Sequence, residues 1–599
     1  MNAFPGGAPP PIEPLETNVA YLRPTTLAGS PRLRTSARRG ALGMGLLLAA
    51  AAGCAPASGP TPAAGPAPAA APAEAFDVLV RGGRIVDGTG NPWYRGDVGI
   101  RGGRIVEIGN LEGRPAARTV DAAGRVVAPG FVDLMGVSTW AFLADPATAE
   151  SRLRQGITTS MAGEGGSHAP MNARVLGDVT LGGQPVRWST FAEYFRLFEQ
   201  RGVALNVVHN VGAAQVRRVA MGDEAGAPTP AQMDEMRRLV RQAMEDGAVG
   251  FSTALIYPPG IYATTEELIE MGKVVGEYGG VYFTHMRNES GGLLDAIRES
   301  IRIGEGAGIP VHIFHLKAAG QENWPRMREA LALIQDARTR GLDVTTDIYP
   351  YIRNGLGLDS FVHPRHYAAG EAAFLATLGD PAVRQALRRE IETTSDWENW
   401  YRHVGGDWGK VLITAVGPRV DRAIVGLSVQ QAADRAGADA WDTYFDLLAR
   451  GGVEVAPESM NEEQKREALR APFVAIETDS PPANPATAAS SHPRAFGAFP
   501  RVLAKYVREE GVLTLEDAIR RMTSLPANRM GLRDRGRIAP GMAADLVIFD
   551  PARIQDRATF TNPLAFATGV EFLFVNGELV IDGERLTDRM PGQVLRRGR

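Results

Sequence analysis

Cysteine is almost absent from this sequence of 599 residues, in which Cys54 is the only one. A single cysteine cannot close an intramolecular disulfide, and it cannot build a cysteine-based zinc site in the folded body. Any metal ion bound by the protein must therefore be held by histidine, aspartate or glutamate.

An excess of positive charge is also missing, because the formal net charge is -4. No basic run with interleaved aromatic residues occurs, so binding to nucleic acid is not expected. The composition, 44% apolar and 22% charged, is that of an ordinary globular protein. The length allows more than one domain.

The first 75 residues differ from the rest. Residues 34–54, "RTSARRGALGMGLLLAAAAGC", combine a basic start, a short apolar run and small residues before Cys54. This pattern is typical of an export signal, and the apolar run is too short for a permanent membrane span. The end of the run resembles a lipoprotein cleavage box, which predicts a periplasmic or cell-envelope lipoprotein lipidated at Cys54; the alternative is a plain signal peptide. Residues 55–75 form an Ala/Pro-rich linker, and membrane contact is expected only through the lipid.

Two β-rich ends enclose an α/β middle. Residues 76–128 and 538–599 contain short alternating runs with Gly-rich turns, such as "FDVLVRGGRIVDGTG" and "FLFVNGELVIDGE", which predict one composite β-sheet domain built from both ends. In residues 129–537, short apolar runs alternate with amphipathic helical patterns, and six or more such units in series favour a TIM-type barrel. Residues 363–470 break this rhythm and predict a mostly helical insertion before the last strand.

Polar residues at strand ends are the candidates for chemistry, because active sites of such barrels lie there. His285 ends "VYFTH" and His315 ends "VHIFH", thirty residues later, so neighbouring strands would bring both imidazoles to one metal ion. His312 points to the opposite side of its strand and is interpreted as packing.

Two carboxylates join these histidines. Asp479 ends "FVAIETD" and could take a proton from water activated by a metal, although an Asp before Ser-Pro could also simply cap a loop. Glu164 lies in the Gly-rich loop "MAGEGGSHAP" and could complete the metal's coordination; the alternative is a turn glutamate in solvent. His168, in the same loop, is a weaker candidate.

Several motifs together resemble the amidohydrolase superfamily, and within it the N-acyl-D-amino-acid deacylase (D-aminoacylase) family. They include "APGFVD", "GFSTALIYPPG", "THMRNE", "HLKAAG", "DIYPY" and "HPRAFGAFPRVL". The resemblance runs from about residue 76 to the C-terminus. It implies a (β/α)8 barrel with a composite β-sandwich and zinc-dependent hydrolysis of an amide. It also implies that His285 and His315 are metal ligands, that Asp479 is catalytic, and that the residues near the substrate pocket are Arg287, Tyr349 and Arg494.

The sequence departs from this family at the second metal site. The His-x-His pair expected after "GFVD" is Met135 and Val137, and the family's bridging cysteine aligns with Gly165, next to Glu164. We therefore expect one zinc ion per chain, held by His285, His315 and Glu164, and a mononuclear mechanism. The expected substrate is an N-acyl-D-amino acid; the alternatives are a non-catalytic exported binding protein and a cyclic-amide hydrolase of the dihydroorotase or hydantoinase type.

Overall fold

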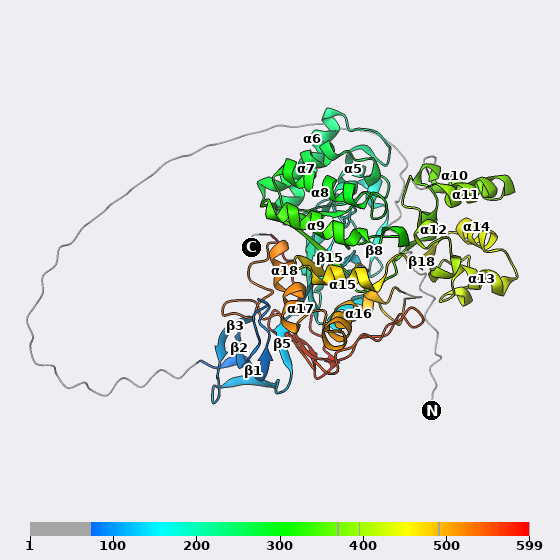
Figure 1. Cartoon of the computed structure of the whole chain (residues 1–599). Coiled ribbons are helices and arrows are strands. Elements are labelled where there is room, and N and C mark those ends of the chain that lie inside the picture. The colour runs from blue at the N-terminus through cyan, green and yellow to red at the C-terminus, as the bar shows by residue number, and fades with distance from the viewer. Residues whose placement is uncertain (1–73, 368–369, 395, 489–490, 598–599) are drawn as a thin grey trace, which may run out of the picture.

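The computed structural model describes residues 74–597, except 368–369, 395 and 489–490 (Figure 1). The predicted export signal, Cys54 and the predicted linker up to residue 73 lie outside the described residues. Figure 1 shows a β-sheet domain at one end, an α/β body above it, and a lobe of helices α10 to α14 to one side. No helix in the described part of the chain is long and apolar enough to cross a membrane.

A nine-stranded sheet combines strands from both ends of the described chain. Its order is β23-β22-β21-β20-β5-β1-β2-β3, with β4 on β1, and β20 joins the two halves by running antiparallel to β5. Alternating apolar residues such as Val98, Val127 and Leu546 build its core. The strands are β1 (Phe76–Ile85), β2 (Tyr94–Arg101), β3 (Arg104–Gly109), β4 (Ala116–Asp121), β5 (Val126–Pro129), β20 (Leu546–Phe549), β21 (Val570–Val575), β22 (Glu578–Asp582) and β23 (Arg585–Leu586).

The body contains two parallel sheets, ordered β10-β7-β6 and β11-β12-β13-β14-β15-β19. Residues of both sheets, including Val132, Phe283 and Ala475, share one buried apolar cluster. At the ends of β19 and β6, the Thr478 hydroxyl donates to Asp133 Oδ2 at 2.7 Å. The strands are β6 (Phe131–Asp133), β7 (Ile157–Ala162), β10 (Asn206–His209), β11 (Val211–Gly212), β12 (Gly250–Ala254), β13 (Val281–His285), β14 (Val311–Ile313), β15 (Val344–Ile348) and β19 (Val474–Ile476).

Helices follow most of these strands, as the sequence pattern predicts. In α6, a capping box between Thr229 and Gln232 starts the helix, and Gly247 in the left-handed region ends it. The helices of the body are α1 (Trp140–Ala144), α2 (Glu150–Leu153), α3 (Ala173–Leu176), α4 (Phe191–Arg201), α5 (Ala213–Met221), α6 (Pro230–Asp246), α7 (Thr265–Glu277), α8 (Leu293–Ala307), α9 (Arg326–Thr339), α15 (Glu462–Arg470), α16 (Arg494–Arg501), α17 (Leu515–Met522) and α18 (Ser524–Arg529). A π-helical segment (Val502–Glu509) follows α16, and β8 (Val179–Leu181) pairs with β9 (Gln184–Val186).

The lobe before β19 has its own apolar core, which includes Trp400, Trp408, Trp441 and Tyr444. It contains α10 (Glu371–Thr377), α11 (Pro381–Thr393), α12 (Trp400–His403), α13 (Val429–Ala436), α14 (Ala440–Arg450) and an antiparallel sheet of β16 (Leu356–Gly357), β18 (Val453–Pro457) and β17 (Val411–Val416). The sequence analysis missed this sheet. It also extended the lobe to residue 470, whereas α15 packs against α9 of the body.

Candidate metal centre and active site

Glu164, His285 and His315 meet at the carboxyl ends of three strands. His285 is the last residue of β13, while His315 and Glu164 each follow their strand, β14 and β7, by two residues. Glu164 Oε1 lies 2.9 Å from His285 Nδ1 and 2.9 Å from His315 Nε2. The structure thus brings together the three residues that the sequence analysis predicts as metal ligands.

Glycines on both sides of Glu164 allow this close approach. Gly163 and Gly165 have φ angles of 110° and 70°, in the left-handed region that favours glycine. A Cβ atom on Gly165 would lie 2.6 Å from the backbone nitrogen of Ala254, and one on Gly163 would lie 2.8 Å from the Asn210 carbonyl oxygen. A larger residue at either position would push the loop, and with it Glu164, away from the histidines.

Negative charge dominates this group. Burial by itself would raise the pKa of Glu164, but the hydrogen bonds to His285 and His315 outweigh it and hold the pKa far below its usual value. Burial and the Lys317 ammonium act to lower the pKa of His315, yet Glu289 and Asp479 outweigh them and raise it to about 10. Such a surplus of carboxylates around two imidazoles favours a bound cation.

The donor set fits a zinc ion. Two imidazole nitrogens and one carboxylate oxygen lie within 4.8 Å of one another, and zinc sites that keep an open position commonly use three such ligands. His285 and His315 are buried, and Glu164 is partly buried, so water is largely excluded from the group.

Behind the histidines lie Glu289 and Lys317, to which the sequence analysis gave no role. Glu289 Oε1 lies 2.9 Å from His315 Nδ1, and Glu289 Oε2 lies 3.6 Å from His285 Nε2. The Lys317 ammonium donates to both oxygens of Glu289 at 2.9 Å. Glu289 stands in the loop after β13, where no periodicity marks it, but its four-residue spacing from His285 was a usable signal.

The lobe contributes one more carboxyl group. Glu398 accepts a hydrogen bond from the backbone nitrogen of Glu289, and His285, Glu289 and Glu398 form a second cluster of possible ligands. Burial and the charge of Glu289 raise the pKa of Glu398 to about 8. The sequence analysis missed Glu398 because it lies more than a hundred residues from its neighbours in the chain.

Asp479 follows β19 and pairs with Arg494, whose Nη1 donates to Asp479 Oδ2 at 2.6 Å. Asp479 and His315 both have positive φ angles, 45° and 36°, which are costly for residues other than glycine. The third such residue near these strand ends is Val137, at 62°. Backbone strain at residues that follow strands is typical of functional sites.

The structure places the other two predicted pocket residues, Tyr349 and Arg287, in different surroundings. Tyr349 follows β15, and its ring lies 4.5 Å from the guanidinium carbon of Arg494. Arg287 donates to Glu299 and to the carbonyl oxygens of Ile261 and Ala263, so its nitrogens are engaged away from Glu164. The substrate-binding role of Arg287 stays a prediction, and these contacts argue against it.

The residues in the place of the His-x-His pair are apolar and packed. Met135 belongs to the buried apolar cluster inside the parallel sheets, with Val137 beside it. His168 lies 3.1 Å from the Ser138 hydroxyl and stacks on Tyr194, apart from the Glu164 group. His312 contacts Thr345 and Asp347 and is buried, in agreement with its interpretation as packing.

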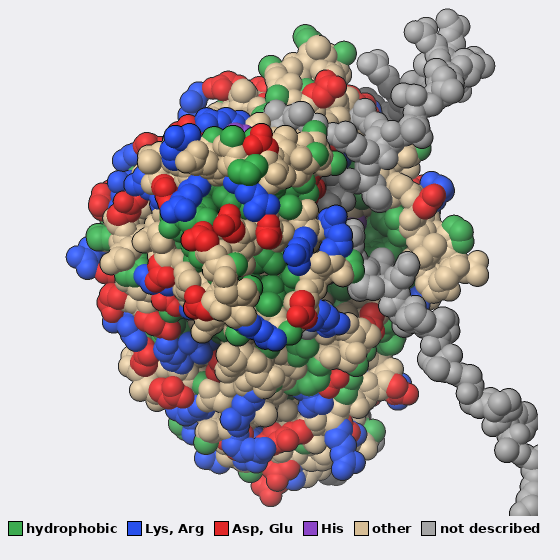
Figure 2. All heavy atoms as spheres, turned by 90° about the vertical axis from the view of Figure 1, so that its right-hand side faces the viewer, with side chains coloured by type: hydrophobic (Ala, Val, Ile, Leu, Met, Phe, Trp, Pro, Cys, Tyr) green, Lys and Arg blue, Asp and Glu red, His purple; other side chains and the backbone are tan. Residues whose placement is uncertain are grey.

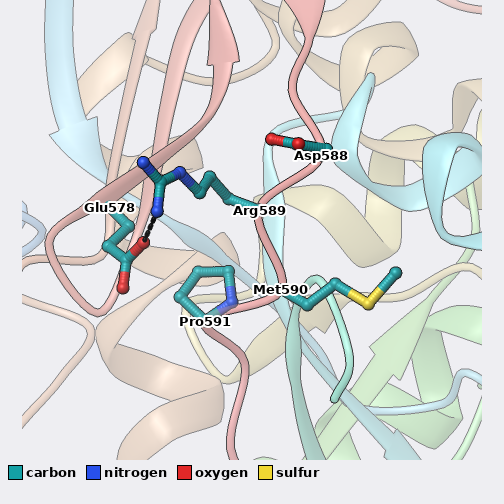
Figure 3. Close-up of a pocket in the computed structure, with 5 residues that line it drawn as sticks. All are labelled: Glu578, Asp588, Arg589, Met590 and Pro591. Carbon is teal, nitrogen blue, oxygen red and sulfur yellow. Dashed lines mark ion pairs between the residues drawn. The ribbon is translucent and has the colours of Figure 1, made fainter. Parts of the chain in front are cut away.

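Among the described residues, both groups of side chains that could hold a metal ion include His285. A pocket near the C-terminus is lined by Glu578, Asp588, Arg589, Met590 and Pro591, and holds a 3.6 Å ion pair between Arg589 and Glu578 (Figure 3). On the face drawn in Figure 2, acidic and basic side chains are intermingled.

The chain matches the amidohydrolase family over residues 118–581 and belongs to that family, in the branch of the D-aminoacylases. It is 34% identical to N-acyl-D-glutamate deacylase from Alcaligenes xylosoxydans xylosoxydans, over 88% of this chain and 97% of that protein. D-aminoacylase of the same organism is also 34% identical, over 88% of this chain and 98% of that protein. The resemblance predicted from the motifs is confirmed.

Solved structures agree with this assignment. N-acyl-D-glutamate deacylase from Bordetella bronchiseptica, complexed with zinc and a phosphonate that mimics the tetrahedral intermediate, is similar with a TM-score of 0.73, at 33% identity over 87% of this chain and 100% of that chain. A D-aminoacylase described with a binuclear metal centre, one-metal activation and second-metal attenuation gives a TM-score of 0.72 at 32% identity, with the same coverage of both chains. These likenesses establish an α/β amidohydrolase fold.

Proposed function

We propose that this protein is a metal-dependent hydrolase of linear amides, which converts N-acyl-D-amino acids into a carboxylate and a D-amino acid. The observation that carries the proposal is the contact of Glu164 with His285 and His315 at the carboxyl ends of β7, β13 and β14. Relatives named for this activity support it, because they align with nearly the whole described chain.

Glu164, His285 and His315 would hold one zinc ion. Zinc bound there would supply Lewis acidity at the scissile carbonyl and lower the pKa of the attacking water. Met135 and Val137 offer no suitable ligand for a second ion at the end of β6. The proposal is therefore for a single metal.

Asp479 would move the proton. Its carboxylate would take the proton of the attacking water and later deliver it to the leaving nitrogen. Arg494 donates to Asp479 Oδ2 at 2.6 Å, and this charge-assisted hydrogen bond orients the carboxylate. The electrostatic effect of Asp479 on His315 supports its position beside the proposed zinc ligands.

The Asp479→Asn variant tests this mechanism. We expect it to bind zinc as the wild type does and to lose about 10²–10⁴-fold in kcat, the usual contribution of general acid–base catalysis. Asp178→Asn is the matched control, because Asp178 is 97% exposed. Rates are measured on N-acyl-D- and N-acyl-L-amino acids with zinc added. Unchanged turnover by Asp479→Asn would remove Asp479 from the mechanism.

A second candidate is a binding protein that keeps the fold without the chemistry, and the loss of His-x-His at Met135 and Val137 favours it. Zinc-loaded protein that binds N-acyl amino acids but hydrolyses no amide would establish this candidate. Turnover of hydantoins or dihydroorotate alone would instead establish a cyclic-amide hydrolase.

We further propose that the two parallel sheets close into one (β/α)8 barrel next to a β-sandwich. The shared apolar cluster and the bond between Thr478 and Asp133 support this closure. Export as a lipoprotein rests on the pattern of residues 34–54. Fractionation of cells tests it: the wild type should be in the membrane and Cys54→Ser should not, and a soluble wild type would contradict lipidation.

A further inference from the structure

The backbone of Asp479 adopts a conformation that its surroundings must maintain. Its φ angle is 45°, in the left-handed region that is costly for a residue with a Cβ atom. Such a conformation persists only where neighbouring contacts determine it. These contacts are made by the residues on either side, Thr478 and Ser480, which are bonded to two buried side chains of other elements.

Asp133 fixes the residue before Asp479. This carboxylate ends β6 and is completely buried. The backbone nitrogen of Thr478 donates to Asp133 Oδ1 at 3.0 Å, and the Thr478 hydroxyl donates to Asp133 Oδ2 at 2.7 Å. Two hydrogen bonds to one carboxylate therefore determine where the chain enters Asp479.

Arg152, in α2, fixes the residue after Asp479. Its side chain is also completely buried, and its Nε lies 3.5 Å from Asp133 Oδ2. One terminal nitrogen, Nη2, donates to the carbonyl oxygen of Ser480, and the other, Nη1, donates to that of Ala495 at 2.9 Å. One guanidinium thus connects the end of β6, the segment after β19 and the first turn of α16.

The two carbonyl groups bound by Arg152 belong to the neighbours of an interacting pair. Ser480 follows Asp479, and Ala495 follows Arg494, whose Nη1 donates to Asp479 Oδ2 at 2.6 Å. A guanidinium is planar and rigid, so its two terminal nitrogens determine the separation of the carbonyl groups that they bind. Arg152 therefore determines the spacing of the two segments that carry Asp479 and Arg494.

The ion pair of Arg152 and Asp133 is by itself a weak source of stability. Burial lowers the pKa of Arg152 to about 10 and raises the pKa of Asp133, because it disfavours both charged forms. Buried ion pairs can often be replaced by apolar side chains of similar volume without loss of stability. An apolar pair could not supply the directed hydrogen bonds to Thr478, Ser480 and Ala495.

We propose that Arg152 and Asp133 are positioning residues for the hydrolysis, which together hold the Asp479 carboxylate where it takes and returns the proton. The inference rests on the proposed function for the role of Asp479. Arg152 and Asp133 act through the backbone on both sides of Asp479.

The Arg152→Lys variant tests this inference, because it keeps a positive charge beside Asp133 but lacks the rigid pair of donors. With zinc added, we expect kcat for N-acetyl-D-amino acids to fall by about 10²-fold, the effect of a misplacement of about 1 Å. KM and the zinc content should stay as in the wild type. Arg217→Lys is the matched control, because Arg217 is 1% exposed and donates to both oxygens of Glu267 at 2.8 Å and 2.7 Å.

Both substitutions weaken a buried ion pair and should lower the melting temperature, but only Arg152→Lys should lower kcat. Equal kcat values of the two variants, or a rise in KM alone, would overturn the inference. If Arg152→Lys does not fold, Thr478→Val tests the contact with Asp133. This variant has nearly the shape of the wild type and should lose about tenfold in kcat, the effect of one hydrogen bond to a charged group. An unchanged kcat would overturn the inference.

Crystal structures separate this inference from the proposed function. The Asp479 carboxylate should move by about 1 Å in Arg152→Lys and keep its place in Arg217→Lys. An unmoved carboxylate in Arg152→Lys would overturn the inference, whatever the activity. If the zinc-loaded wild type hydrolyses no amide, the proposed function fails, and the two structures still decide whether Arg152 determines the position of Asp479.

Discussion

The two candidate histidines differ in how their ring nitrogens are held. One nitrogen of His285 and one of His315 face Glu164, and His315 Nδ1 lies 2.9 Å from Glu289 Oε1. His285 Nε2 lies 3.6 Å from Glu289 Oε2 and has no hydrogen-bond partner among the described residues. A carboxylate on the far nitrogen fixes the orientation and tautomer of an imidazole, so that the near nitrogen presents its lone pair to a metal. Glu289 is therefore a positioning residue for His315, and its charge also lies close to His285.

Replacement of Glu289 should weaken metal binding. We expect Glu289→Gln to lower the affinity for zinc by about 10–100-fold, as for other outer-shell partners of zinc-bound histidine. Competition with a chromophoric chelator measures this affinity independently of activity. Glu266→Gln, whose side chain is 67% exposed, is the control. An unchanged affinity in Glu289→Gln would show that the carboxylate does not support the ligands.

Strand-end position was enough to predict His285, His315 and Asp479 from the sequence, because the ends of parallel strands lie at one edge, and the Gly-rich loop indicated Glu164. The structure brings Glu164, His285 and His315 together. Residues of the surroundings carry no such signal. Glu398 comes from the lobe, and only the fold brings it to the site. The sequence showed directly that the His-x-His pair is missing, whereas the sequence analysis did not recognise Glu289, the carboxylate behind the histidines.

At the scale of elements, the lobe is held together by aromatic rings. Trp408 is 4% exposed, and its ring centroid lies 4.8 Å from that of Tyr444 and 5.6 Å from that of Phe361. Stacked and edge-on aromatic pairs add to the free energy of burial. Because Glu398 belongs to this lobe, the packing of the lobe also positions the Glu398 carboxyl group beside the candidate metal centre.

Truncation of Trp408 should destabilise the lobe. We expect Trp408→Ala to lower the free energy of unfolding by about 3–5 kcal/mol, the usual cost of removing a large buried aromatic side chain. Trp93→Ala should change it by about 0.5 kcal/mol or less, because Trp93 is 43% exposed. Denaturant titration followed by fluorescence provides the measurement, and equal effects of the two substitutions would contradict this account of the core.

The long, regular strands and helices could be predicted from the sequence. Buried runs such as "VYFTH" gave the parallel strands, because β-branched and aromatic residues between helical patterns have few other interpretations. The sheet of β16, β17 and β18 escaped prediction, since β16 has two residues and β17 carries an irregularity in its pairing with β18. The sequence analysis placed the end of the lobe too late, because the amphipathic pattern of α15 does not show whether this helix packs on the lobe or on the body.

At the scale of the whole molecule, the last residues of the chain connect its parts. The backbone nitrogen of Val207 donates to the Gln593 carbonyl at 2.9 Å, and that of Leu595 donates to the Val207 carbonyl at 2.9 Å. The segment that follows the nine-stranded sheet therefore runs along β10 of the parallel sheet. Leu595 is buried in the apolar cluster of the parallel sheets.

Removal of this segment should weaken the entire fold. We expect deletion of residues 588–599 to lower the free energy of unfolding by about 2–3 kcal/mol or more, from the burial of Leu595 alone. Leu586→Ala, at a residue 40% exposed, should stay within about 0.5 kcal/mol of the wild type. Thermal unfolding compares the two, and a truncated chain as stable as the wild type would show that the segment is dispensable.

The pairing of β20 with β5 also determines when the nine-stranded sheet can be completed during folding. Strands β1 to β5 are synthesised before the other described strands, and β5 pairs with β1. It gains its second neighbour, β20, only after residues 546–549 have been added, more than four hundred residues later. Contacts so distant in sequence form slowly, and the unpaired edge stays exposed until then. The nine-stranded sheet, whose first strands are made early, is thus completed only after most of the chain has been synthesised.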